Sequence, residues 1–321
     1  MRPFLPLLVL FLLAAPPVRP AAESADTPRP LICDLHSHAS PWKGVGDSGS
    51  LAPEDSLALH AAKGYDVVVW SPHSDFATRG AERMRAFAAA LALMPLRKGK
   101  TVLRLGLELT LEPGPNYRKT LGVGNNDHLG FVGLKVPLPH GLSWRAAFEL
   151  AHARGALGTI NHPGPGPAEW EEGYWQKPDL LPLADGLECY NGRLAALGRF
   201  EEAAYRWAVS RGARLFCTGG TDFHKRDDPL RVATTVYVRP GEGLLDALRA
   251  RRTVALSDTA LAPPLAVAHL GEAVVGERVK LSIEFARRMD RVFLYRGEKV
   301  FKRFEGVERA EAEVPCSGDA W

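Results

Sequence analysis

The sequence predicts an α/β protein, with a distorted seven-stranded (β/α) barrel followed by a small C-terminal β module. Short apolar runs rich in branched side chains alternate with helical patterns from residue 31 to about residue 256. After Pro263 and Pro264 the pattern becomes an alternation of apolar and polar residues. Repeated strand–helix units favour a parallel sheet, and seven strands favour its closure into a barrel. We therefore expect a barrel over 31–258 and a β module over 263–321.

The apolar runs place the expected elements of the barrel. The strands are expected at Leu31–Leu35, Val67–Ser71, Val102–Leu109, His128–Val132, Gly155–Ile160, Gly186–Tyr190 and Arg214–Thr218. Helices are expected to begin near Pro53, Gly80, Ser143, Ala195 and Gly241. Proline suits a first helical turn because its missing N–H has no partner there in any case.

The composition is that of a globular protein. With 321 residues, of which 46% are hydrophobic, the chain can bury a substantial core. Forty Lys and Arg residues against 37 Asp and Glu residues give a net charge of only +3, and the arginines form no stripe. We therefore expect no nucleic-acid partner.

The N-terminus has the pattern of a secretory signal peptide over residues 1–22. A positive charge at Arg2 precedes the apolar run from Phe4 to Ala15, and prolines and small residues follow. The run is too short to cross a hydrocarbon core of ~30 Å as a helix. We expect an exported protein, periplasmic or extracellular, with no membrane span after cleavage. An uncleaved N-terminal anchor is the alternative.

The four cysteines show no spacing typical of a metal site. Export would permit a disulfide, for which Cys33 and Cys217 are the favoured pair. Buried apolar thiols are the preferred interpretation.

Histidines and carboxylates gather where the expected strands end. Because the carboxyl ends of parallel strands meet on one face, side chains there are expected to share one cavity. Imidazole and carboxylate groups are the usual ligands of zinc, manganese and iron. The sequence therefore predicts a site for several metal ions, with the ligands His36, His38, Asp47, His73, Glu108, His128, His162, Asp222 and His224.

Two local patterns support this prediction. Residues two apart in a strand point to the same side, so His36 and His38 can bind one ion, and Asp222 and His224 repeat this spacing. Glu108 lies within an apolar strand, where an unpaired carboxylate would be costly and a cation would compensate it. The remaining histidines, His60, His140, His152 and His269, have no such placement and are expected to be structural.

The ordered set resembles the PHP (polymerase and histidinol phosphatase) family. The segments that carry the resemblance are Asp34-Leu-His-Ser-His, Ser71-Pro-His-Ser-Asp, Gly106-Leu-Glu, Asn161-His-Pro, Glu188-Cys-Tyr-Asn and Gly220-Thr-Asp-Phe-His, with Asp47 and His128 between them. Within this family, the segments are similar in particular to a branch that includes aryl carbamate hydrolases and is often exported. The match spans residues 31 to 224, nearly the whole expected barrel.

The resemblance implies up to three metal ions. The first would be held by His36, His38, Glu108 and Asp222, the second by Glu108, His128 and His162, and the third by Asp47, His73 and His224. The sequence departs from the family pattern at two places, which both concern the third ion. Asp47 follows His36 after a slightly long gap, and Ser-Pro precedes His73 where the family usually has Thr-Asp.

The expected activity is hydrolysis of a phosphate ester by a hydroxide that bridges two divalent ions, with Glu108 and Asp222 as catalytic residues. Two to three ions and three carboxylates leave the site electropositive, which favours a small anionic ester as substrate. Arg226 lies two residues past His224 and is the favoured substrate contact among the nearby basic residues, which include Arg118, Lys119, Arg193 and Lys225.

Two other functions stay open at this stage. A carboxylic ester, carbamate or amide hydrolase would use the same hydroxide and the same ions. A non-catalytic exported binding protein would keep the metals for stability and use its β module for recognition. The complete ligand set argues against the binding protein, because loss of function usually removes ligands first.

Overall fold

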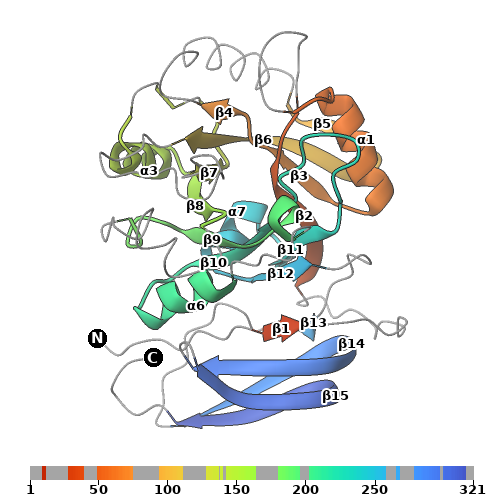
Figure 1. Ribbon diagram of the computed structural model, residues 1–321, viewed down its shortest axis with the longest axis vertical. Helices are drawn as coiled ribbons and strands as arrows, with labels where there is room; N and C mark the ends of the chain where they lie inside the picture. The colour runs from red at the N-terminus through yellow and green to blue at the C-terminus, as the bar shows by residue number, and fades with distance from the viewer. Residues whose placement is uncertain are drawn as a thin grey trace.

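The structure contains a larger sheet of eleven strands and a smaller sheet of four (Figure 1). This computed structural model describes residues 9–11, 28–39, 49–74, 94–110, 128–136, 138–139, 142–163, 180–195, 202–257, 265–267, 278–296 and 299–315. The predicted α/β barrel with a C-terminal β module is confirmed.

The larger sheet contains all seven expected strands, with ends shifted by no more than two residues. These strands are β2 (Arg29–Ser37), β3 (Val67–Trp70), β6 (Thr101–Thr110), β7 (His128–Val132), β8 (Leu157–Asn161), β9 (Gly186–Asn191) and β10 (Phe216–Gly220). Beyond β2, the sheet continues with β11 (Val232–Val238) and β12 (Thr253–Ser257), which the apolar pattern did not separate from the helical segments. Two short strands, β4 (His73–Ser74) and β5 (Leu96–Lys98), pair with β6.

The barrel closes where the residues after β10 meet the end of β2. His38 N–H donates to the carbonyl of Phe223 at 2.8 Å, and Asp222 N–H donates to the carbonyl of His36 at 2.9 Å. Ser37 and Phe223 form a parallel bridge at the same point. We call this contact between β2 and residues 221–224 the seam. It brings the first and last ligand-bearing segments of the chain together.

The sheet is not parallel throughout, which corrects one expectation. β7 is antiparallel to both β6 and β8, and β11 is antiparallel to both β2 and β12. The other neighbours along β2-β3-β6 and β8-β9-β10 are parallel, as expected. Because β7 runs the opposite way, the N-terminal end of β7, where His128 lies, joins the face at which the parallel strands end.

Helices cover the barrel largely where they were expected. The described helices are α1 (Pro53–Lys63), α3 (Trp144–Ala153), α5 (Gly192–Ala195), α6 (Glu202–Ser210) and α7 (Leu244–Arg249). The helix expected near Gly80 lies outside the described residues. The one expected near Ala195 is represented by α5, which ends there, and by α6. Within the described residues, no helix is both long and apolar enough to cross a membrane.

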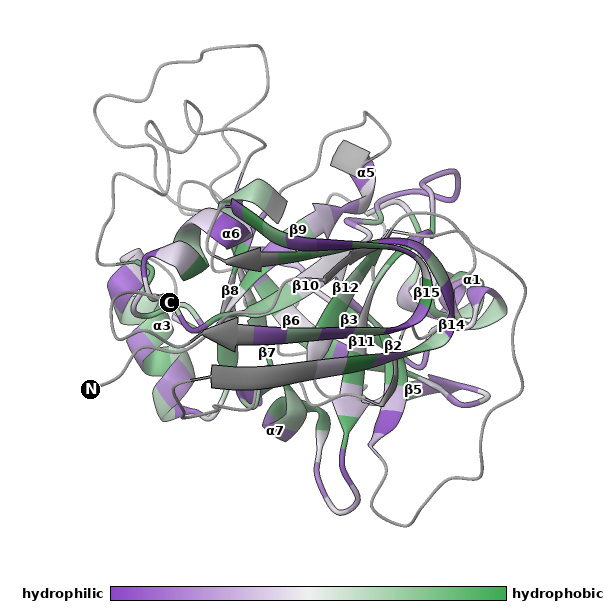
Figure 2. Ribbon diagram, turned by 90° about the horizontal axis from the view of Figure 1, so that it is seen from below, coloured by the Kyte–Doolittle hydropathy of each residue, from purple (hydrophilic) through white to green (hydrophobic). Residues whose placement is uncertain are grey.

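The smaller sheet forms one layer below the barrel (Figure 1). It consists of β1 (Val9–Phe11), β13 (Leu265–Val267) and the long hairpin of β14 (Arg278–Arg296) and β15 (Lys299–Pro315). β1 comes from the apolar run of the expected signal peptide and pairs with β14. Buried side chains of β14, including Phe285, Met289 and Val292, belong to the same continuous core as the barrel. Figure 2 shows the hairpin lying across the barrel strands.

The three described cysteines, Cys33, Cys189 and Cys217, are buried free thiols. This agrees with the interpretation preferred from the sequence over a disulfide between Cys33 and Cys217.

The expected helix start at Ser143 provides a test of the fold. Ser143 has extended backbone angles, and its hydroxyl accepts a hydrogen bond from Ala146 N–H at 3.2 Å. Ser143→Ala should lower the free energy of unfolding by about 1 kcal/mol, because one N–H at the helix start loses its partner. Ser143→Asp should keep the stability. Urea denaturation would measure both, and equal stability of Ser143→Ala and the native protein would show that the cap contributes nothing.

Candidate metal centre

Eight of the nine expected ligands lie in one cluster at the ends of the barrel strands. β2 supplies His36 and, one residue past its end, His38, while β4 and β6 supply His73 and Glu108. The remaining four are His128 at the start of β7, His162 just after β8, and Asp222 and His224 just after β10. Asp47 lies outside the described residues.

Glu108 is the centre of this cluster. Its Oε1 lies 2.9 Å from His128 Nδ1 and 3.0 Å from His36 Nε2. Its Oε2 lies 3.2 Å from His38 Nε2 and 3.3 Å from His73 Nδ1. The side chain is only 1% exposed. A single buried carboxylate therefore faces ligands of every group that the family resemblance implies, as a bridging ligand must.

Asp222 completes the group implied for the first ion. Its Oδ1 lies 3.3 Å from His38 Nε2 and 3.7 Å from His36 Nε2, and these two ring nitrogens are 3.2 Å apart. Asp222 has a φ of 51°, in the left-handed region that non-glycine residues rarely adopt. The turn that follows β10 thus holds a strained backbone in order to point this carboxylate at the two histidines.

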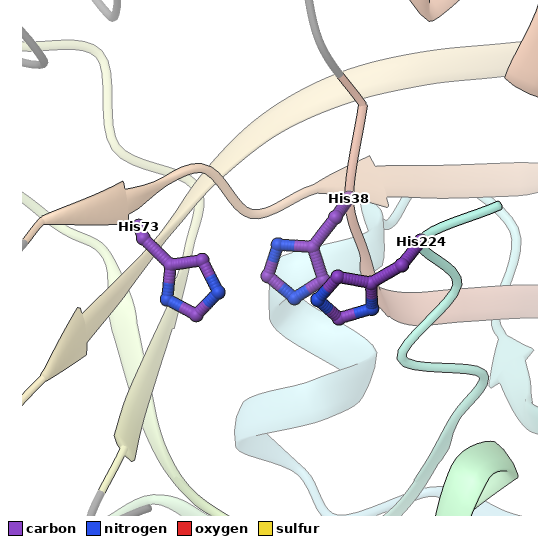
Figure 3. A group of neighbouring side chains, drawn as sticks. All are labelled: His38, His73 and His224. Atoms are coloured by element: carbon purple, nitrogen blue, oxygen red, sulfur yellow. The ribbon is translucent and has the colours of Figure 1, made fainter. Parts of the chain in front are cut away.

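A third group joins His38, His73 and His224 (Figure 3). The His38 and His73 rings are stacked with centroids 4.5 Å apart, and the His38 and His224 centroids are 4.2 Å apart. The resemblance assigned His38 to the first ion alone. The structure places it between the first and third groups, so it can serve either.

The donor atoms fit divalent cations. Four sets of three ligands have donor atoms within 4.8 Å of one another: His36, His38 and Asp222; His36, Glu108 and His162; His73, Glu108 and His128; and His38, His73 and His224. The Nε2 atoms of His36 and His38 lie 3.2 Å apart, and once deprotonated each would offer a lone pair to a shared cation. Nitrogen and carboxylate oxygen together suit zinc, manganese and iron.

The carboxylates and imidazoles shift each other's protonation. Burial raises the pKa of Glu108, but the charges of His128 and His36 outweigh it and hold that pKa well below its ordinary value. Burial likewise raises the pKa of Asp222, but the charge of His36 and the hydrogen bond and charge of His38 outweigh it, so the net shift of this pKa is downward. Both carboxylates therefore stay ionised and ready to bind cations.

The pKa values of two histidines, His36 and His162, are shifted in the opposite direction. Burial lowers the pKa of His36, but Glu108 and Glu188 outweigh it and raise that pKa well above its ordinary value. The pKa of His162 is also raised, because its hydrogen bond to Glu108 and the charge of that carboxylate outweigh burial. Without metal, protons take the place of cations among these carboxylates.

Glu188 on β9 belongs to the site but was not among the expected ligands. It is buried, and its Oε1 lies 3.1 Å from His36 Nδ1. Its Oε2 accepts hydrogen bonds from His162 N–H at 2.8 Å and from Asn191 Nδ2 at 3.2 Å. The carboxylate fixes the His36 ring so that Nε2 faces Glu108 and Asp222. The argument that singled out Glu108, a carboxylate within an apolar strand, applies equally to Glu188.

Of the basic residues expected near the substrate, Arg193, Lys225 and Arg226 lie within the described residues, whereas Arg118 and Lys119 lie outside them. Arg226 is exposed, and within the described residues no hydrogen bond or ion pair links it to the cluster. Arg193 on α5 lies closer, with Nη1 3.4 Å from His224 Nδ1. His224 Nδ1 already donates to the carbonyl of Asp222 at 2.6 Å, so it cannot accept from Arg193. The guanidinium therefore lies beside the cluster with donors available.

No family profile and no curated protein sequence matches the chain. Solved structures do. A two-domain protein from Bacteroides vulgatus, described as containing a predicted PHP-like metal-dependent phosphoesterase, is 18% identical, with 94% of this chain and 91% of that one covered and a TM-score of 0.49. PsfC from Pseudomonas syringae is 16% identical, with 72% and 93% covered and a TM-score of 0.50. An amidohydrolase from Chromobacterium violaceum is 14% identical, with 69% and 97% covered and a TM-score of 0.40.

At these identities the likeness is one of fold, and PsfC supports it best. The chemistry of the chain is argued below from its own residues.

The central position of Glu108 can be tested by Glu108→Gln. The substitution keeps the shape but removes the negative charge that offsets neighbouring cations, so the metal content should fall by about one ion per chain. Elemental analysis after loading with Zn²⁺ or Mn²⁺ would measure it. Glu149→Gln on the exposed surface of α3 is the matched control and should keep full metal content. A Glu108→Gln protein with unchanged metal content would contradict the bridging position.

The raised pKa values predict how metal binding depends on pH. In the metal-free protein, His36 and His162 keep their protons to a higher pH than ordinary histidines do, and a cation must displace those protons. Metal binding should therefore release protons, and affinity should fall as the pH drops through the raised pKa values. Calorimetric titration with Zn²⁺ in buffers of different ionisation enthalpy would count the protons. Binding without proton release near neutral pH would contradict the shifts.

Proposed function

We propose that the chain is a metal-dependent phosphoesterase of the PHP family that hydrolyses a small anionic ester. The observation that carries the proposal is Glu108, a buried carboxylate in contact with four histidines that lie on, or directly after, the strands β2, β4 and β7. The PHP-like motifs and the barrel fold support the same assignment. Two or three divalent ions would be held by the eight clustered residues, together with Asp47.

Divalent ions in such a site make water nucleophilic at neutral pH and offset charge on the phosphoryl oxygens. The protein contributes the positions of the groups around them. Glu108 and Glu188 are each 1% exposed, whereas Asp222 is 11% exposed. Asp222 is therefore the most exposed of these three carboxylates, and we assign its carboxylate to accept a proton from the attacking water. Asn191 Nδ2 donates to Asp222 Oδ2 at 3.3 Å and keeps Oδ1 turned toward the histidines.

Arg193 supplies the recognition of an anionic group. Within the described part of the chain it forms no ion pair with a carboxylate, and its guanidinium lies beside His224 at the edge of the cluster. A planar guanidinium donates two parallel hydrogen bonds to phosphate or carboxylate oxygens. Arg226 is a second candidate, because it lies two positions after His224, the last residue of the seam.

We further propose that the protein is exported, on the support of the N-terminal apolar run from Phe4 to Ala15. We also propose the domain division expected from the sequence, a barrel over 31–258 and a β module over 263–321, and the presence of two separate sheets supports it.

The reaction can be tested with a substrate panel. Metal-loaded protein should hydrolyse aryl phosphate mono- or diesters faster than aryl carboxylic esters or carbamates of the same leaving group. Initial rates over the panel would measure this preference, with Glu108→Gln as the inactive control. A preference for carbamates would instead support the carbamate-hydrolase branch, and no turnover of any ester would support a binding protein.

The assignment of Arg193 predicts a selective effect on substrate binding. Arg193→Ala should raise KM for a phosphate ester about tenfold or more, since a hydrogen bond to a charged group contributes roughly 1.5–3 kcal/mol. Arg226→Ala, measured in parallel, decides between the two candidates. Arg211→Ala is the matched control, because Arg211 is exposed and stacks on Trp207 with its Cζ 4.0 Å from the ring centroid. Equal KM values for all four proteins would remove both arginines from the substrate site.

A further inference from the structure

A buried polar pair, Asp34 and His60, lies next to the cluster of expected ligands but is not part of it. Both residues have no exposed surface, and His60 Nε2 lies 2.9 Å from Asp34 Oδ2. Asp34 comes from β2, two residues before the ligand His36, and His60 comes from α1. His60 was expected from the sequence to be structural, and the resemblance assigned no role to Asp34. Full burial of such a pair is costly unless its hydrogen bonds are satisfied.

The Asp34 carboxylate is satisfied by groups from both sides of the seam. Its Oδ1 accepts from the backbone N–H of His36 at 3.2 Å and of Thr221 at 3.0 Å. Its Oδ2 accepts from the Thr221 hydroxyl at 2.5 Å and faces His60. One carboxylate thus ties the strand that carries His36 to the turn that carries Asp222.

His60 anchors this carboxylate to the helix layer. Its Nδ1 lies 2.7 Å from the carbonyl oxygen of Ser56, which only accepts, so Nδ1 carries the hydrogen. The His60 ring packs edge-on against two aromatic rings, and its centroid lies 5.1 Å from that of Tyr65 and 5.2 Å from that of Phe223. His60 therefore cannot turn away from the seam without losing contacts on every side.

The seam needs such support because its backbone is strained. Asp222 adopts a φ of 51°, and a non-glycine residue keeps this conformation only when its surroundings impose it. Two hydrogen bonds hold the residues on either side: Thr221 N–H to Asp34, and Phe223 N–H to the Thr221 hydroxyl at 3.2 Å. The position of the Asp222 carboxylate thus depends on a hydrogen-bond chain that begins at His60.

We propose that Asp34 and His60 are positioning residues that lock the seam so that His36 and Asp222 face the same metal ion. Within the described residues no hydrogen bond joins the pair to a ligand side chain, and Asp34 acts through the backbone N–H of His36 and through the backbone N–H and hydroxyl of Thr221. The inference rests on the metal centre of the proposed function, but it does not depend on which ester is hydrolysed. Its loss should therefore alter metal binding before it alters anything else at the site.

The test compares His60→Leu, His60→Gln and Asp34→Asn with the control Tyr65→Phe. Tyr65→Phe removes a buried hydrogen bond, from the Tyr65 hydroxyl to the carbonyl of Val232 at 2.7 Å, without touching the seam. Co²⁺ is the probe, because its visible absorption reports the geometry of the ligands around it. Affinity for Co²⁺ and its spectrum are measured on each full-length protein, and unfolding by urea is measured on the metal-free forms.

His60→Leu should weaken Co²⁺ binding by roughly 10–100-fold, as is typical for residues behind metal ligands, and should change the spectrum. Asp34→Asn should lose less, because the amide oxygen can accept from the two N–H groups while the amide nitrogen donates to His60 Nε2. Tyr65→Phe should lower stability yet keep the affinity and spectrum of the native protein. If His60→Leu does not fold, His60→Gln, which can still donate to Asp34, should show an intermediate loss of affinity.

Native affinity and spectrum in the folded His60 variants would overturn the proposal, as would equal losses of affinity in Tyr65→Phe. A native protein that binds no Co²⁺ would overturn it too, together with the metal centre. Native Co²⁺ binding without hydrolysis of any phosphate ester would refute the proposed function alone and leave the positioning role in place.

Discussion

The burial of the Glu108 carboxylate among imidazole rings is the constraint on which the rest of the structure depends. A carboxylate with 1% exposure is stable only if positive charge or several donors surround it. The barrel satisfies this condition by bringing the ends of β2, β4, β6 and β7 to one point. The low pKa of Glu108 and the raised pKa of His36 are two aspects of the same attraction. A cation bound there would replace those protons as the positive charge beside the carboxylate.

The closure of the barrel serves the same constraint. The seam is made by backbone hydrogen bonds at the ligands themselves, because His36 and His38 pair with Asp222 and Phe223. The close approach requires the absence of a side chain at Gly220, where a Cβ would lie 2.4 Å from His36 Cβ and 2.5 Å from Glu188 Oε1. Fold and site are therefore not separable here. A change that opens the seam also separates the ligands.

The sequence predicted the site better than the sheet. Strand-end placement identified eight residues that do cluster, since residue spacing in a strand fixes which side chains share a face. Strand direction is not encoded in that spacing, so the antiparallel β7 and β11 were missed. His128 nevertheless reached the site, because it begins an antiparallel strand rather than ending a parallel one. The role of Glu188 was missed for a different reason. The spacing argument identifies metal ligands, whereas Glu188 contacts Nδ1 of the ligand His36, the ring nitrogen that does not face Glu108 and Asp222.

Residues behind the ligands orient both the side chains and the backbone of the ligand-bearing segments. Glu188 holds the His36 ring through Nδ1, while Asp34 accepts from the His36 backbone N–H. Asn191 in turn holds Asp222 Oδ2, and Thr221 connects the same turn to Asp34. His36 and the turn that carries Asp222 are thus each held at two points that no single substitution removes together. Such redundancy keeps the ligands in place before a metal arrives, so that binding energy is not spent on ordering them.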